Sequence, residues 1–89
     1  MSRPVELRLV GARNARTNRA LAALLTATSA RIDFPPNLAL VSIPVGADPK
    51  VLIKHLDVLN EVHGAPEKGN VGAVRQTAYD ETISAGQEP

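Results

Sequence analysis

The chain has 89 residues, with no cysteine, no tryptophan, one tyrosine and one phenylalanine. This length allows one small domain, and a chain without cysteine has no disulfide, no metal–thiolate site and no cysteine nucleophile. With 44% hydrophobic and 21% charged residues, the composition is typical of a globular domain rather than of a disordered chain. We therefore expect one domain over residues 1–77 and a flexible tail over residues 78–89.

The net charge of +1 hides an uneven distribution along the chain. Residues 1–31 hold six arginines and one glutamate, a local net charge of +5, whereas residues 32–89 hold four basic and eight acidic groups, a net charge of −4. The sequence has no signal-like apolar stretch at its start and no run of about 18 apolar residues. We therefore expect a cytoplasmic protein.

The first predicted element is a half-buried strand over residues 5–10, where apolar and polar side chains alternate with a period of two. Gly11 ends this alternation, and either Asn14 or Thr17 can cap the helix that follows. A stripe of leucines at spacings of three and four predicts that this helix packs on the sheet and ends near Ser29.

A hairpin of two strands is predicted over residues 30–45. Residues 31–34 alternate, Pro35-Pro36-Asn37 is a turn, and residues 38–45 form a second extended run. Both faces of this second run are largely apolar, so we expect it in the centre of the sheet.

Asp48-Pro49 predicts the start of a second helix, because Asp accepts from free backbone donors and Pro is tolerated at the first helical position. Its apolar residues sweep about half a helical wheel at roughly 100° per residue, and Gly64 ends it. After Pro66 the pattern weakens, and the segment 70–83 fits either a short strand or a helix. We predict a strand near residues 71–75, because the sheet needs a fourth member.

This order of elements, βαββαβ, predicts an α+β ferredoxin-like sandwich, with two helices on one face of an antiparallel sheet. The pattern of residues 5–64 resembles the heavy-metal-associated domain, a family of copper chaperones and N-terminal modules of metal-transporting P-type ATPases. Three segments carry the resemblance: Val5–Gly11 with the Arg-rich turn and leucine stripe after it, residues 30–43, and residues 48–57.

The chain departs from this family at the metal-binding loop. The family's loop reads Gly-Met-Thr-Cys-x-x-Cys, and when it is aligned on Gly11 the two cysteines fall on Asn14 and Thr17. Cu(I) requires soft thiolate or thioether ligands, which an amide and a hydroxyl do not supply. The resemblance therefore implies a member that has lost its metal site, and we expect neither a metal nor another cofactor.

Three arginines, Arg13, Arg16 and Arg19, lie in the same loop and at the start of the first helix, where they would favour an anion. The simpler interpretation is a solvated helix face. Nucleic acid fits less well, because the pI is about 8.2 and one Phe and one Tyr offer few stacking platforms. A ribbon-helix-helix arrangement is weaker again, since the strand at 38–45 offers only Ser42 as a polar group for a DNA groove.

The sequence shows no catalytic constellation. It has no Ser-His-Asp set, no paired catalytic carboxylates, no phosphate-binding loop and no dinucleotide fingerprint, so we do not expect an enzyme. His55 and His63 in the second helix have no metal-ligating neighbours at helical spacing, and we expect both to be packed or partly exposed residues.

The uncovered face of the predicted sheet would display Arg8, Val10, Leu38 and Leu40 beside Glu6. Apolar residues on an open sheet suggest a protein partner or self-association through this face or a sheet edge. We therefore expect a protein-interaction or regulatory module, acting alone or as the cytosolic N-terminal piece of a P-type ATPase. The alternative is a small nucleic-acid- or anion-binding protein that uses the three arginines.

Overall fold

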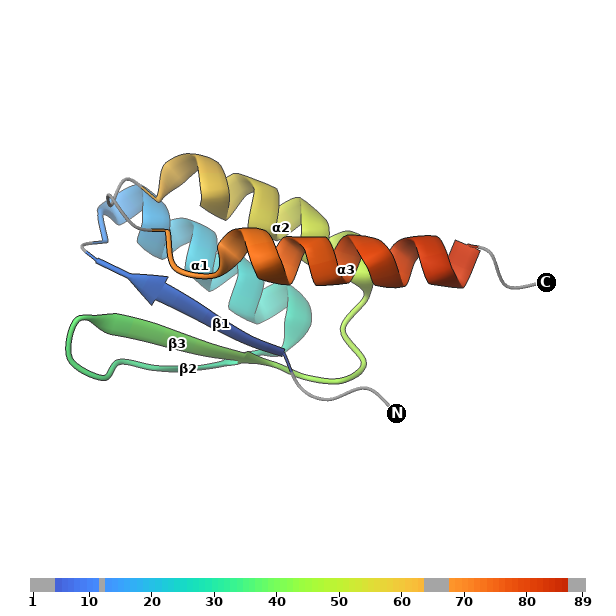
Figure 1. Ribbon diagram of the computed structural model, residues 1–89. Coiled ribbons are helices and arrows are strands. Elements are labelled where there is room, and N and C mark those ends of the chain that lie inside the picture. The colour runs from blue at the N-terminus through green and yellow to red at the C-terminus, as the bar shows by residue number, and fades with distance from the viewer. Residues whose placement is uncertain (1–4, 12, 64–67, 87–89) are drawn as a thin grey trace.

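The computed structural model describes residues 5–11, 13–63 and 68–86 (Figure 1). The protein has α+β architecture in the order β-α-β-β-α-α. Its elements are β1 (Val5–Val10), α1 (Ala15–Thr28), β2 (Arg31–Asp33), β3 (Leu38–Ile43), α2 (Pro49–Val62) and α3 (Val71–Gly86).

The three strands form one antiparallel sheet in the order β1-β3-β2. The central position predicted for the strand after the double proline is thereby confirmed. Both outer strands pair antiparallel with β3, so β1 and β2 run parallel to each other on its two sides. All three helices lie on the same side of the sheet, which leaves its other face uncovered (Figure 1).

The core lies between the sheet and the helices and is almost entirely aliphatic. Its buried hydrophobic members are Leu7 and Leu9 of β1, Ala39, Val41 and Ile43 of β3, Ala20, Leu21 and Leu24 of α1, Leu52, Leu56 and Leu59 of α2, and Val71, Val74 and Ala78 of α3. Each fully buried Val, Leu or Ile side chain contributes about 1.5–3 kcal/mol by leaving water. The core thus uses one face of every strand that it contacts, as the alternation predicts.

Side-chain caps define where the first two helices begin. Asn14 caps α1, because its side-chain oxygen accepts from the backbone N–H of Thr17 at 2.8 Å. Asp48 caps α2 by accepting from the N–H of Lys50 at 2.9 Å, and Pro49 occupies the first helical position as predicted. α1 ends at Ser29, which adopts a left-handed φ of 56°.

The predicted fourth strand is wrong: residues 71–75 belong to α3. The buried residues Val71, Val74 and Ala78 follow helical spacing, and α3 packs against α2 and β1. The fold is therefore not a full ferredoxin-like βαββαβ. α3 also continues through residues 78–86, where a tail was expected, and Ala78 within that stretch is only 1% exposed.

An ion pair joins α3 to α2 near the surface. The guanidinium of Arg75 donates to the carboxylate of Asp57. This hydrogen bond, and then the negative charge of Asp57, raise the pKa of Arg75 above its ordinary value. Within the ranges that the structure describes, no helix is long and apolar enough to cross a lipid bilayer.

Candidate functional site

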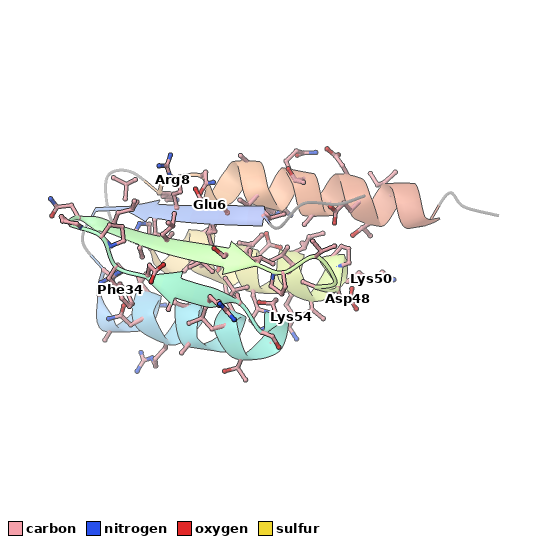
Figure 2. The ribbon with its side chains drawn as sticks, turned by 90° about the horizontal axis from the view of Figure 1, so that it is seen from below. Glu6, Arg8, Phe34, Asp48, Lys50 and Lys54 are labelled. Carbon is pink, nitrogen blue, oxygen red and sulfur yellow. The ribbon has the colours of Figure 1, made fainter. Side chains whose placement is uncertain are left out.

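The face of the sheet opposite the helices is the candidate site, and we call it the open face. Figure 2 views the molecule from this side, with the strands in front of the helices. The open face consists of Glu6, Arg8 and Val10 of β1, Arg31 and Asp33 of β2, and Leu38, Leu40 and Ser42 of β3. It brings together the four residues singled out in the sequence, Arg8, Val10, Leu38 and Leu40.

The strand register arranges these side chains in rows that cross the sheet. In the order β1, β3, β2, the first row is Glu6, Ser42 and Arg31, the second is Arg8, Leu40 and Asp33, and the third is Val10 and Leu38. The three apolar side chains are half-buried, whereas the four charged side chains are exposed. The open face therefore has an apolar middle with charges on the two outer strands.

Neighbouring charges on β1 form an ion pair along the strand. The Nε of Arg8 lies 3.6 Å from a carboxylate oxygen of Glu6, and both side chains are more than half exposed. An exposed pair of this kind contributes between zero and about 1 kcal/mol to stability. The Arg8 guanidinium and the Glu6 carboxylate can therefore leave this ion pair at little cost and pair with charges of a partner.

The outer edge of β1 is closed by Asn70, the residue that precedes α3. Its backbone N–H donates to the carbonyl of Arg8 at 3.0 Å, and its side-chain Nδ2 donates to the carbonyl of Glu6 at 2.8 Å. Its side-chain oxygen accepts from the N–H of Arg8. A single residue thus satisfies three backbone groups that a fourth strand would otherwise pair.

Gly69 allows this close approach. It has a φ of 66°, and a Cβ at this position would lie 1.8 Å from the carbonyl oxygen of Arg8. Only glycine combines the left-handed conformation with such backbone contact. The sequence interpretation missed Asn70, and the adjacent Gly69-Asn70 pair, which is typical of turns, is the one local signal that marks it.

A shallow hollow of about 410 Å³ lies where this closed edge meets the open face. Arg8, Val10, Leu38, Gly69 and Asn70 line it. The hollow extends the half-buried third row of the open face to the edge of the sheet. The candidate site is thus a broad, shallow surface rather than a deep cleft.

Asn14 and Thr17, which take the cysteine positions of the resembled family, serve as structural links. The Oγ1 of the buried Thr17 lies 3.0 Å from the capping oxygen of Asn14 and 3.1 Å from the carbonyl oxygen of Val62, at the end of α2. Asn14 therefore caps α1, and Thr17 connects the first turn of α1 to the end of α2.

The two histidines bond to backbone carbonyls. His63 is 1% exposed, and its Nε2 donates to the carbonyl of Val10 at 3.1 Å, while its buried Nδ1 has no partner among the described residues. His55 has its Nδ1 2.8 Å from the carbonyl of Val51 in its own helix. Over residues 5–11, 13–63 and 68–86, no three His, Asp or Glu side chains are grouped to hold a metal ion.

The three arginines of the first loop and helix are all exposed. Arg13 lies over the ring of Phe34, with its guanidinium carbon 4.6 Å from the ring centroid, a cation–π geometry. Arg16 and Arg19 lie on α1, three positions apart. Arg13 is thus directed to the turn between β2 and β3, where Phe34 is labelled in Figure 2.

This geometry defines a class of protein: a small α+β domain whose three-stranded antiparallel sheet is covered by helices on one face only. No protein-family model matches the chain, and no curated protein or solved structure matches it significantly.

Proposed function

We propose that the protein is a non-catalytic interaction module that binds a protein partner through the open face. The observation that carries this proposal is the distribution of polarity on that face. The exposed face of an antiparallel sheet usually carries polar residues where it meets water. Here Leu38 and Leu40 occupy the central strand instead, and Leu40 has a charged residue on each side.

An apolar centre with a polar rim is the organisation of protein–protein interfaces. Leu40 is the centre, because it has Arg8 on one side and Asp33 on the other. Burying one leucine against a partner contributes about 1.5–3 kcal/mol, whereas the charges around it select the partner and its orientation.

The edges of the sheet support binding through the face rather than by strand addition. Asn70 occupies the outer edge of β1. The outer strand β2 is only three residues long and is followed by Pro35 and Pro36. A short strand next to proline offers few backbone groups to an added strand.

The link to metal transport rests on the resemblance of residues 5–64 alone. Asn14 and Thr17 are occupied by hydrogen bonds inside the domain, which supports a role without soft metal. We therefore propose the interaction module as a function in its own right, and attachment to a P-type ATPase as one setting in which it would act.

Site-specific photo-cross-linking tests this function. A photoreactive residue replaces Ser42, which is exposed on the open face, and in a control it replaces Val58, which is 46% exposed on α2. We expect a discrete protein adduct in cells from position 42 and none from position 58. Adding Leu40→Gln should reduce the adduct several-fold. The same adducts from both positions, or an adduct unaffected by Leu40→Gln, would contradict the proposal.

A second candidate is an anion or nucleic-acid binder that uses Arg13, Arg16 and Arg19. The observation that favours it is that all three side chains are exposed and the first turn of α1 has no acidic residue. Affinity for a single-stranded oligonucleotide should then fall steeply with salt and fall further in Arg16→Ala. An absence of binding at low salt would eliminate this candidate.

A further inference from the structure

We propose that the partner of the open face is a second copy of this chain, related by a two-fold axis that runs parallel to β3. In this dimer, Glu6 of each copy faces Arg31 of the other, and Arg8 faces Asp33. The inference rests on the proposed function, because it names the partner of the same surface.

The order of charges within the rows carries the argument. From β1 to β2, the first row reads negative at Glu6, neutral at Ser42 and positive at Arg31. The second row reads in the opposite sense, positive at Arg8 and negative at Asp33, with Leu40 between them. Each row therefore carries opposite charges at its two ends.

A two-fold rotation about an axis parallel to β3 makes the charges of one copy complementary to those of the second copy. The rotation places β1 of one copy opposite β2 of the other and β3 opposite β3. Each row keeps its position along the strands, so it faces the same row of the second copy. Both charged rows then meet their opposites, and Leu40 meets Leu40 of the second copy. Closed dimers usually have such two-fold symmetry, in which one surface pairs with itself.

The dimensions of packed sheets fit this arrangement. Two aligned sheets pack about 10 Å apart, and their strands cross at about 30°, so side chains from both faces meet in the middle. The third row supplies apolar contact. Pro35, whose carbonyl accepts from the N–H of Leu38 at 3.1 Å, lies beside that row and would face Val10 of the second copy.

One alternative face-to-face arrangement is disfavoured by the same charges. A two-fold axis that lies across the strands at the second row would place Arg8 opposite Arg8 and Asp33 opposite Asp33. Like charges at an interface repel and select against that orientation. An axis across the strands midway between the first and second rows would also place opposite charges against each other, with Glu6 facing Arg8. It would, however, place Leu40 opposite Ser42. The axis parallel to β3 is therefore the arrangement that pairs the charges and also brings the central leucines together.

The size of the open face predicts a weak dimer. Three strands of up to six residues cover about 20 Å by 15 Å, which is small beside the roughly 800 Å² per partner of a standard stable interface. We therefore expect dissociation constants in the micromolar to millimolar range, with affinity that decreases as salt increases.

Sedimentation velocity of charge-reversed chains tests the proposal. Glu6→Arg places Arg opposite Arg31, and Arg31→Glu places Glu opposite Glu6, so each variant alone should dimerise at least about tenfold more weakly than the natural chain. A 1:1 mixture of the two variants restores both pairs across the interface and should dimerise at close to the natural affinity. Glu61→Arg, a reversal at an exposed position of α2, is the control and should change little.

The mixture separates interface effects from folding effects, because a variant that fails to fold is not rescued by another chain. If the natural chain dimerises but the 1:1 mixture of the two variants does not recover its affinity, the two-fold arrangement is wrong. A natural chain that stays monomeric at millimolar concentration would overturn self-pairing. In that case an adduct to a different protein at position 42 would leave the proposed function standing, whereas the absence of any adduct would remove both.

Discussion

Gly69 and Asn70 together close the outer edge of β1. Asn70 forms three hydrogen bonds to the backbone of β1, and Gly69 allows the chain to come close enough to make them. Unpaired backbone groups on a strand edge attract other strands. The pair therefore closes this edge without a fourth strand.

Substitution of Gly69 provides the residue-scale prediction. Gly69→Ala introduces a Cβ in contact with the carbonyl of Arg8 at a positive φ, and should destabilise the domain by about 2 kcal/mol or more. The matched control is Gly72→Ala, because Gly72 is exposed in α3 and its added Cβ meets no atom within 4 Å. The control should stabilise the domain by about 0.5–1 kcal/mol. Urea unfolding measures both changes, and equal effects of the two substitutions would contradict this role of Gly69.

At the scale of elements, the segment predicted as a fourth strand is the helix α3. It buries Val71, Val74 and Ala78 against the core, and the Arg75–Asp57 pair joins it to α2. The residue that starts the helix also closes the edge of the neighbouring strand. Helix docking and edge protection are thereby coupled.

Asn70→Ala separates these two functions of the α3 segment. We expect α3 to remain helical, because its packing is unchanged, while the Arg8 amide loses its acceptor and exchanges with solvent at least about tenfold faster. Gln76→Ala, at an exposed position of α3, is the control and should leave that exchange unaltered. Hydrogen exchange followed by NMR makes the comparison. Unchanged protection of Arg8 in Asn70→Ala would show that the edge is held by other contacts.

The elements that the sequence predicts correctly depend on local patterns. The alternation of residues 5–10 and the caps at Asn14 and Asp48 act within a few positions, so they can be recognised without tertiary information. The segment 70–83 fits either a strand or a helix by its local sequence pattern. In the folded protein this segment is helical, and Asn70 at its start bonds to Arg8, 62 positions earlier. A contact between such distant residues leaves no periodic pattern in the sequence.

The open face was only partly predictable for the same reason. The alternation of β1 and β3 places Arg8, Val10, Leu38 and Leu40 on one side. The contribution of Arg31 and Asp33 depends on the register of β2 against β3, which determines the row that each charge joins. At the cysteine positions of the resembled family, Asn14 caps α1 and Thr17 links it to the end of α2.

At the scale of the whole molecule, the domain is asymmetric. Helices cover one face of the sheet (Figure 1, Figure 2). On the other face, Leu40 lies between charges of opposite sign. A small domain with such a face gains stability when the face is covered, because association favours the folded state by mass action. We therefore expect the thermal midpoint to rise with protein concentration.

Amide chemical shifts followed from micromolar to millimolar concentration test most directly that the open face pairs with itself. The account predicts shift changes concentrated in β1, β2 and β3, largest around Arg8, Leu40 and Asp33, and absent in Leu40→Gln. Shift changes centred on the exposed sides of α1, α2 or α3, or spectra that do not change with concentration, would contradict it.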